Sequence, residues 1–265
     1  MDTPWILILG VSSGFGAAAA RAFAAAGYDV AGVHLDRRAG QVLADALAAD
    51  IRAMGRQALF FNVNAADDER RAETMAALSA ALPAGSLRVF LHSLAFGTLK
   101  AFVPAATATG NDAKGVTRKQ LDMTLDVMGN SLVYWSQDLV AAGLFSDNSR
   151  IYAMTSSGSH MAWPGYGPVS AAKAALEAHI RQLAIELAPR GITANSILAG
   201  VTPTAALEKI PGAGKLIEKA LGRNPNGRLT TPEDVAACLV DLARPGTRWL
   251  NGNVLRVDGG EDCSG

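Results

Sequence analysis

Residues 5–27 read WILILGVSSGFGAAAARAFAAAG, a pattern that identifies the class of fold. The five residues from Trp5 to Leu9 are all apolar, as in a strand that is buried on both faces of a parallel sheet. A glycine-rich turn follows, and an alanine-rich helix is predicted from there to Gly27. Strand, glycine turn and helix in this order open many doubly wound α/β folds.

The alternation of strand and helix continues along the whole chain. Further strands are predicted at 28–35, 58–63, 87–92, 150–154, 192–197 and 253–257, and helices at 42–54, 67–82, 118–144, 168–188 and from 231 onward. This order predicts an α/β, doubly wound (Rossmann) parallel sheet of about seven strands with helices on both faces. Because no linker, repeat or low-complexity stretch interrupts the pattern, residues 1–265 are predicted to form a single domain.

Two segments, 98–116 and 202–228, fit neither pattern. Both follow the carboxyl ends of predicted strands, where sheets of this type bind their ligands. We expect them to form a substrate loop and a lid; the alternative is that they are plain surface loops. The pattern resumes with TPED at 231–234, which has a threonine N-cap, a proline at the first helical position and acids in the first turn.

The composition excludes several classes of protein. Hydrophobic residues make up 49% and charged residues 18% of the chain, so it is not mainly disordered. Lys+Arg and Asp+Glu both number 24, and the zero net charge provides no general attraction to nucleic acid or to anionic membranes. Cys238 and Cys263 are too few and too scattered for a disulfide framework or a zinc site, so no metal is predicted and a reducing, cytoplasmic setting is expected.

No apolar run in the sequence is long enough for a transmembrane helix. Residues 1–22 resemble a signal peptide in having an apolar stretch before small residues. However, Asp2 is the only early charge and no basic residue precedes Arg21. A strand that runs into a helix is therefore the preferred interpretation, and no membrane partner is predicted.

The turn LGVSSGFG lies between the first strand and the first helix. Glycines allow a tight turn whose backbone amides, together with the helix N-terminus, approach a pyrophosphate. We therefore predict cofactor binding by Gly10, Ser12, Ser13, Gly14, Phe15 and Gly16. No Gly-Lys-Ser/Thr follows, which excludes a P-loop, and a merely structural turn is the alternative.

The sequence HLDRR at the end of the second predicted strand bears on the choice of cofactor. An acid at this point binds the adenine ribose hydroxyls of NAD, whereas arginines bind the 2′-phosphate of NADP. Asp36 lies late for the first role, while Arg37 and Arg38 offer two guanidinium groups for the second. NADPH is predicted, with NADH as the second candidate and a solvated turn of mixed charge as the alternative.

Tyr166 precedes Lys173 by seven residues, so on one helix the two side chains would share a face. A phenol with a pKa near 10 is a poor acid or base at neutral pH, but an adjacent ammonium group lowers that pKa. Tyr166 and Lys173 are therefore candidate catalytic residues, and Lys173 is also a candidate for binding a ribose hydroxyl. A packed tyrosine and an unrelated surface lysine are the alternative.

With these motifs the sequence resembles the short-chain dehydrogenase/reductase family over nearly its whole length. The matching segments are GVSSGFG, Asn62-Val63, the serines near 156, SAAKAALE, ITANSILAG, TPEDVA and NGNVLRVDGG. The resemblance implies a nicotinamide cofactor beside the tyrosine and lysine, with Ser156 positioning the substrate or, alternatively, capping backbone. It also implies cofactor contacts at Asn62, Val63, Ser93, Leu94, Ala95, Lys173, Gly200, Thr202 and Thr204.

Three departures from the common pattern resemble one branch of that family, the enoyl-acyl-carrier-protein reductases. Ketone-reducing members have Tyr-x3-Lys and Asn-Asn-Ala-Gly, but this chain has Val169 at the tyrosine position and the segment HSLAF at 92–96. Met128 falls where those members have a structural asparagine. The glycine turn, in contrast, follows the family's common pattern, as in the NADPH-dependent form of that reductase.

The shifted tyrosine suits a conjugated thioester. Three residues on a helix move the phenol about one turn away from Lys173. An enoyl thioester accepts hydride at its β-carbon, so its carbonyl oxygen lies farther from the nicotinamide than that of a ketone. We therefore expect Tyr166 to hydrogen-bond the developing enolate oxygen and Lys173 to orient the ribose. No donor of the α-carbon proton is identified.

Further residues are assigned from their types and from the resemblance. Phe96, Phe102, Met161 and Trp163 are expected to line an acyl slot, with ordinary core packing as the alternative. His92 is expected to make a structural hydrogen bond near the cofactor rather than to act as an acid or base.

Together, these observations predict an oxidoreductase that reduces the 2,3-double bond of a trans-2-enoyl thioester with NADPH in fatty-acid synthesis. The substrate partner is expected to be a small or carrier-bound acyl group, on acyl carrier protein or CoA. An NAD(P)H-dependent carbonyl or alcohol oxidoreductase is the first alternative, and a non-catalytic dinucleotide-binding regulator is the second. The resemblance also implies a homotetramer.

Overall fold

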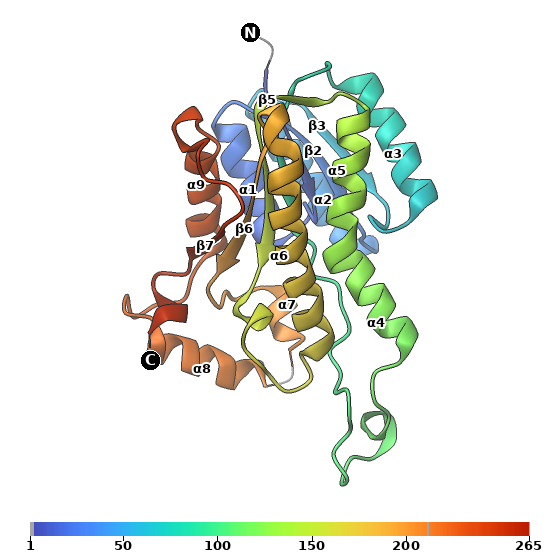
Figure 1. The fold of residues 1–265 in the computed structure, drawn as a ribbon, viewed down its shortest axis with the longest axis vertical. Helices are drawn as coiled ribbons and strands as arrows, with labels where there is room; N and C mark the ends of the chain where they lie inside the picture. Colours follow the sequence, from blue (N-terminus) through green and yellow to red (C-terminus); the bar gives the residue numbers. More distant parts are fainter. Residues whose placement is uncertain (1–2, 211, 265) are drawn as a thin grey trace.

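The computed structural model describes residues 3–210 and 212–264 and contains the predicted alternation of strands and helices (Figure 1). The strands are β1 (Trp5–Leu9), β2 (Asp29–His34), β3 (Ala58–Asn62), β4 (Leu87–His92), β5 (Phe145–Thr155), β6 (Thr193–Ala199) and β7 (Val254–Val257). The principal helices are α1 (Gly14–Ala25), α2 (Arg38–Ala53), α3 (Asp68–Ala81), α4 (Arg118–Leu125), α5 (Ser131–Ala141), α6 (Gly167–Leu187) and α9 (Pro232–Leu242).

The seven strands form one parallel sheet in the order β3-β2-β1-β4-β5-β6-β7. The strand order reverses between β1 and β4, where Leu9 pairs with His92. Connections leave these two strands in opposite directions, which opens a crevice at their carboxyl ends. The predicted doubly wound α/β fold is confirmed, and the crevice marks the edge at which this fold binds ligands.

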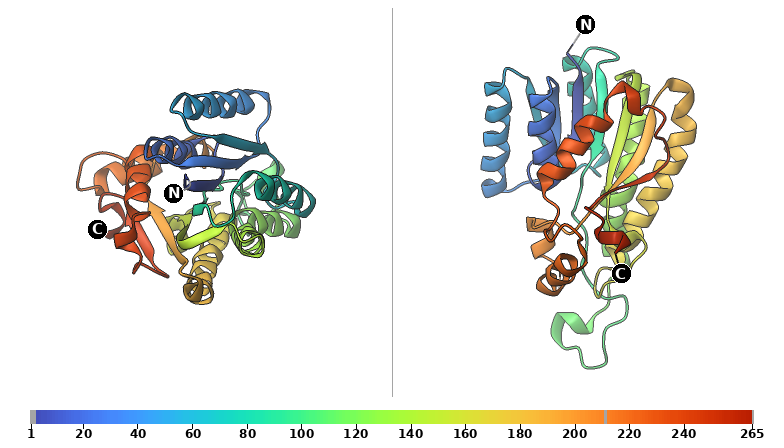
Figure 2. Two further views of the ribbon diagram at one scale, coloured as in Figure 1. Left: turned by 90° about the horizontal axis from the view of Figure 1, so that it is seen from above. Right: turned by 90° about the vertical axis from the view of Figure 1, so that its left-hand side faces the viewer.

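Both faces of the sheet are covered, which explains why the strands are nearly all apolar. In β1, Ile6 and Ile8 pack toward the layer formed by α1, α2 and α9. Leu7 and Leu9, on the alternate positions, pack toward α3, α5 and α6, where Trp135 is fully buried. Figure 2 shows these two layers of helices on either side of the sheet.

The helical stretch predicted at 118–144 is present from 118 to 141, but it is not one regular α-helix. A π-helical turn, Asp126–Asn130, separates α4 from α5. Inside this turn, Gly129 lets α6 pack closely, since a Cβ there would lie 3.2 Å from the carbonyl oxygen of Ala172. Turns of this kind often lie at functional sites, and this one carries Met128 toward the carboxyl edge of the sheet.

The segment 202–228 contains two helices that the sequence pattern did not predict, α7 (Ala205–Glu208) and α8 (Ala213–Arg223). Thr204 begins the first of them, because its hydroxyl accepts the backbone N–H of Leu207 at 3.3 Å. The signal for α8 was present at helical spacing in its less exposed residues, Leu216, Ile217 and Ala220. Neighbouring prolines and glycines obscured that signal.

The segment 98–116 projects from the body of the molecule beyond α4 (Figure 1). The backbone N–H of Val116 donates to the carbonyl oxygen of Ala101 at 3.0 Å, which closes the base of the projection. Among the described residues, no helix is long and apolar enough to cross a membrane.

The predicted start of α9 offers a test of how this fold is stabilised. The Thr231 hydroxyl accepts the backbone N–H of Asp234 at 3.2 Å, and the Asp234 carboxylate accepts the Thr231 N–H at 2.9 Å. We expect Thr231→Ala to lower the free energy of unfolding by about 1 kcal/mol, as measured by urea denaturation. Thr231→Ser, which retains the hydroxyl, should stay close to the parent; equal losses in the two variants would contradict this role of the cap.

Candidate active site

Two adjoining hollows lie at the carboxyl edge of the sheet. One, the glycine groove, has a volume of about 970 Å³ and is lined by the turn from Gly10 to Phe15. The other, the tyrosine cavity, has a volume of about 320 Å³ and is lined by Tyr166 and the segment after β6. Six residues line both hollows, which are therefore continuous: Phe15, Ala95, Phe96, Thr204, Ala206 and Lys209.

The glycine turn brings unpaired backbone amides to the groove. Gly10 and Gly14 have φ angles of +88° and +52°, which only glycine adopts readily. A Cβ at Gly16 would overlap the carbonyl oxygen of Gly10, so this residue closes the turn instead of lining the groove. Ser13, at the N-cap of α1, makes no capping bond with its side chain. The first amides of α1 are thus available to an anion such as a pyrophosphate.

Asp36 lies two residues beyond the end of β2 and lines the glycine groove. Its carboxylate Oδ2 is 2.9 Å from His34 Nδ1, and the Asn62 side chain holds its backbone from both sides at 3.0 Å and 2.9 Å. Asn62 therefore positions Asp36, and it does not itself line the groove. Arg37 and Arg38 are exposed at the N-terminus of α2, next to Asp36 and outside the groove lining.

The remaining predicted wall of the groove is formed as expected. Val63, Ser93, Leu94 and Ala95 all line it, from the ends of β3 and β4. A Cβ at Gly10 would lie 2.5 Å from the carbonyl oxygen of Ser93, so the two strand ends can meet this closely only because Gly10 has no side chain. The groove thus runs across the point at which the strand order reverses.

His92 makes the structural hydrogen bond that was predicted for it. The side chain is fully buried, and its Nε2 lies 2.9 Å from Ser131 Oγ, which donates its own hydrogen to the carbonyl oxygen of Val127. Burial, and then the positive charge of Lys173, lower the pKa of His92 to about 3. The imidazole is therefore neutral at ordinary pH, and it links β4 to the π-helical turn.

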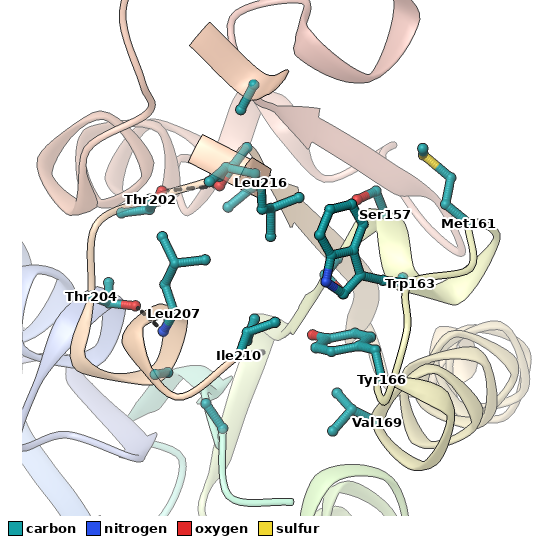
Figure 3. A pocket seen from close by; sticks show the side chains of 18 of the residues that line it. Ser157, Met161, Trp163, Tyr166, Val169, Thr202, Thr204, Leu207, Ile210 and Leu216 are labelled. Carbon is teal, nitrogen blue, oxygen red and sulfur yellow. Dashed lines mark hydrogen bonds between the residues drawn. The ribbon is translucent and has the colours of Figure 1, made fainter. Parts of the chain in front are cut away.

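Tyr166 occupies the N-cap position of α6 and points into the tyrosine cavity (Figure 3). Burial raises the pKa of its phenol, and the adjacent Ser156 hydroxyl opposes that rise to a smaller extent. Lys173 does not contribute, so the predicted lowering of this pKa by the ammonium group is wrong. The phenol remains protonated at neutral pH and acts as a hydrogen-bond donor.

Ser156 follows β5 and lines the same cavity as Tyr166. Its Oγ is buried and lies close enough to the Tyr166 phenol to lower the pKa of that group, but it makes no well-formed hydrogen bond within the described residues. A ligand oxygen in the cavity would complete the hydrogen bonding of this hydroxyl. Tyr166 and Ser156 thus place two hydroxyl groups together in the cavity.

Lys173 is buried behind these hydroxyls and lines neither hollow. Its Nζ donates to the carbonyl oxygen of Met154 at 2.7 Å and to that of Leu94 at 3.4 Å. Burial lowers the pKa of Lys173 to about 8, while the carboxylate of Glu177 acts in the opposite direction. Val169, between Tyr166 and Lys173 on the chain, fills part of the cavity wall.

Most of the other predicted residues line the tyrosine cavity, namely Phe96, Met161, Trp163, Gly200, Thr202 and Thr204. In Figure 3 the rings of Tyr166 and Trp163 face Ile210 across the cavity. Phe102 is an exception and was wrongly predicted. Its ring is 56% exposed and packs over Gly167 at the start of α6, outside the cavity lining.

Two further groups of cavity residues were not named individually from the sequence, although most of the first lies in segment 202–228, which was expected to form a lid. The first comes from the segment with α7 and α8 and includes Val201, Leu207, Ile210 and Leu216. The second is the pair Glu261 and Asp262, which follow β7. An amphipathic pattern in the sequence indicates part of the first group. Nothing in the sequence indicates that Glu261 and Asp262 lie beside Val201, about sixty positions earlier.

The donor set suits a dinucleotide and not a metal ion. No group of three or more His, Cys, Asp or Glu side chains that could hold a metal occurs in the part of the chain that the structure describes. The groove suits a nicotinamide dinucleotide, because it has the amides at the start of α1 on one side and Asp36, Arg37 and Arg38 on the other. The hydroxyls of Ser156 and Tyr166 beside it suit a substrate that carries an oxygen.

Comparisons with known proteins agree with this geometry. A family model described as Enoyl-(Acyl carrier protein) reductase matches residues 10–261. The Enoyl-[acyl-carrier-protein] reductase [NADH] of Aquifex aeolicus is 30% identical over 181 residues, which cover 68% of this chain and 64% of that relative. The chain thus spans slightly less than two thirds of that relative's length in the alignment.

Two solved structures are similar over nearly their full length. The crystal structure of the Aquifex aeolicus enzyme superposes with a TM-score of 0.83 at 26% identity, covering 100% of this chain and 98% of the other. A short chain dehydrogenase from Burkholderia cenocepacia, in complex with NADP, superposes with a TM-score of 0.80 at 29% identity, covering 98% of each chain.

The tight glycine turn leads to a direct test of the groove. We expect Gly16→Ala to weaken NADPH binding at least about tenfold, because the added methyl group must displace the Gly10 carbonyl and the start of α1. Titration of nicotinamide fluorescence measures this affinity. Gly246→Ala is the matched control, since a Cβ there meets no atom within 4 Å. Equal affinities of the two variants would show that the turn does not hold the cofactor.

Proposed function

Because this chain belongs to the enoyl-(acyl carrier protein) reductase family of short-chain dehydrogenases/reductases and is an NAD(P)H-dependent oxidoreductase, we propose that it reduces trans-2-enoyl thioesters with NADPH. The proposed role is fatty-acid synthesis, with the acyl group on acyl carrier protein or CoA. The observation that carries the proposal is the position of Tyr166, at the N-cap of α6 and one turn ahead of the cavity-lining Val169.

The position and pKa of Tyr166 suit a donor to an enolate oxygen. The cofactor, when bound in the glycine groove, supplies hydride to the β-carbon of the substrate. The electron pair of the double bond then moves toward the thioester oxygen, and the protonated phenol of Tyr166 donates a hydrogen bond to that oxygen. The α-carbon takes a proton to complete the reduction. A phenol whose pKa is raised by burial suits donation better than proton abstraction.

Ser156 and Lys173 support that role from two directions. The Ser156 hydroxyl lies beside the phenol, makes no well-formed hydrogen bond within the described residues and can donate a second hydrogen bond to the same oxygen. The Lys173 ammonium group is held by the carbonyl oxygens of Met154 and of Leu94, and Leu94 lines the glycine groove. We propose that Lys173 orients the nicotinamide ribose from behind this wall.

The proposed preference for NADPH rests on the exposed guanidinium groups of Arg37 and Arg38 at the N-terminus of α2. A 2′-phosphate on the adenine ribose would be accessible to both groups. The Asp36 carboxylate, which lines the glycine groove, opposes this preference by repulsion. NADH is therefore the second candidate.

A carbonyl reductase is the second candidate function, and one observation favours it. Ser156 and Tyr166 place two hydroxyl groups together, an arrangement that also suits the oxygen of a ketone. We also propose that segment 202–228 forms the lid and the base of 98–116 the substrate loop. A homotetramer in the cytoplasm is proposed as well, and the exposed Trp249 and Ile185 offer apolar contact surface.

The decisive experiment follows oxidation of NADPH and of NADH with a short 2-enoyl thioester and with the matched 3-ketoacyl thioester. The proposal requires turnover of the enoyl substrate, faster with NADPH. Turnover of the ketone alone would establish the carbonyl reductase instead.

We expect Tyr166→Phe to lower kcat at least about a hundredfold while leaving the cofactor Kd unchanged, because only the donor to the enolate is removed. Tyr134→Phe, on α5 and outside the lining of both hollows, serves as the matched control.

The lowered pKa of Lys173 predicts how kcat/KM for the cofactor depends on pH. Because burial lowers this pKa to about 8, the ammonium group loses its proton as the pH rises through that value. We expect kcat/KM for the cofactor, which reports the free enzyme, to be constant below about pH 7 and to decline above about pH 8. A profile that is flat to pH 9.5 would show that the charge on Lys173 is not required.

A further inference from the structure

Residues 258–264, which follow β7, form a compact turn that contacts three separate walls of the tyrosine cavity. The turn is stabilised from within by Asp258, whose carboxylate accepts the backbone N–H of Gly260 at 3.0 Å and that of Asp262 at 2.9 Å. We call it the acidic turn. None of its outward contacts is needed by the reaction proposed above, so their function requires another explanation.

The first contact holds the chain just after β6. Both oxygens of the Glu261 carboxylate lie close to the backbone nitrogen of Val201, at 3.0 Å and 3.2 Å. Gly200 makes this approach feasible, because a Cβ there would lie 2.8 Å from a Glu261 oxygen. Thr202 and Thr204 come next on the chain and line the cavity, and Thr204 also lines the glycine groove.

The second contact holds the far end of α8. The guanidinium group of Arg223 donates two hydrogen bonds to the carbonyl oxygen of Ser264, at 3.0 Å and 2.6 Å. Asn224 donates to the carbonyl oxygen of Asp258 at 3.0 Å. The acidic turn therefore anchors segment 202–228 at both of its ends, while α7 and the start of α8 lie between these anchors.

The third contact reaches the loop that precedes α6. His160 Nε2 lies 3.2 Å from the carboxylate of Asp262, which also pairs with Arg256 at 3.1 Å. This loop carries Met161 and Trp163 into the cavity wall. Of the three contacts, the one made by Glu261 is closest to the junction of groove and cavity, since it holds the residue before Thr202.

We propose that Glu261 is a positioning residue for the acyl substrate: its carboxylate holds Val201, and through it the Thr202–Thr204 backbone, at the junction of the two hollows. This inference rests on the proposed function for the identity of the substrate. The hydrogen bond itself does not, because it exists in the protein alone. Glu261 acts through Val201, and no contact with the reacting atoms is assigned to it.

The surroundings of Glu261 make this hold dependent on pH. Burial raises the pKa of its carboxyl group, and the charges of Asp258 and Asp262 act in the same direction. The hydrogen bond from the Val201 backbone and, to a smaller extent, the charge of Arg223 lower that pKa without reversing the rise. The carboxylate therefore takes up a proton at a higher pH than an ordinary glutamate. As the pH falls through that value, the charged acceptor is lost and the bond to Val201 weakens.

Hydrogen exchange tests the contact without any substrate. We expect the Val201 amide to exchange about tenfold faster in Glu261→Ala, because its charged acceptor is gone. Glu261→Gln keeps an acceptor oxygen and should restore most of the protection. The matched control is Glu218→Ala, on the exposed side of α8. Equal exchange at Val201 in Glu261→Ala and in the control would overturn the proposal.

Kinetics then tests the consequence for the substrate. We expect Glu261→Ala to raise the KM for the enoyl thioester about tenfold, with kcat within about twofold and the NADPH Kd unchanged. In the parent protein this KM should rise as the pH falls through the raised pKa of Glu261, whereas in Glu261→Gln it should stay constant. An unchanged KM in Glu261→Ala, or a loss confined to kcat, would overturn the proposal. If no enoyl thioester is turned over by the parent, the proposed function fails, and the exchange result still decides whether Glu261 holds Val201.

Discussion

The close approach of backbone to backbone at Gly10 is the constraint on which the rest of the site depends. The carbonyl oxygen of Ser93 lies on one side of this residue and Gly16 closes the turn on the other, with no room for a side chain at either contact. The two central strands therefore end side by side, and α1 begins directly above them. This places the first amides of α1 beside the groove, and Lys173 lies buried behind the groove-lining Leu94, to whose carbonyl oxygen its Nζ donates.

Burial controls the chemistry of the polar groups that lie beyond this point. His92 is neutral because no solvent reaches it, and Lys173 holds its proton less tightly for the same reason. Tyr166 is affected in the opposite direction, since its charged form is the deprotonated one. One physical cause thus yields a neutral linking imidazole, a titratable ammonium group and a phenol that donates hydrogen bonds.

Local patterns were sufficient wherever a residue's role depends on its neighbours in the chain. The glycine turn, the Thr231 cap and the buried strands were predicted from spacing and residue type alone, and the structure confirms them. The helical stretch at 118–144 was also predicted, but its π-helical turn was not, because that turn accommodates the packing of α6, which lies about forty residues later. Phe102 was misplaced for a similar reason, since an aromatic residue near a site can equally well cover a helix start.

The sequence by itself determined the fold class, the position of the glycine turn between the first strand and the first helix, and the seven-residue spacing of Tyr166 and Lys173. Each of these follows from periodicity or from short-range spacing, which backbone geometry converts directly into structure. Only the tertiary structure decided that Asn62 holds Asp36, that the pKa of Tyr166 is raised and that Glu261 holds Val201. These are contacts and burial between residues far apart in the chain, and they arise only when the sheet and its helices pack together.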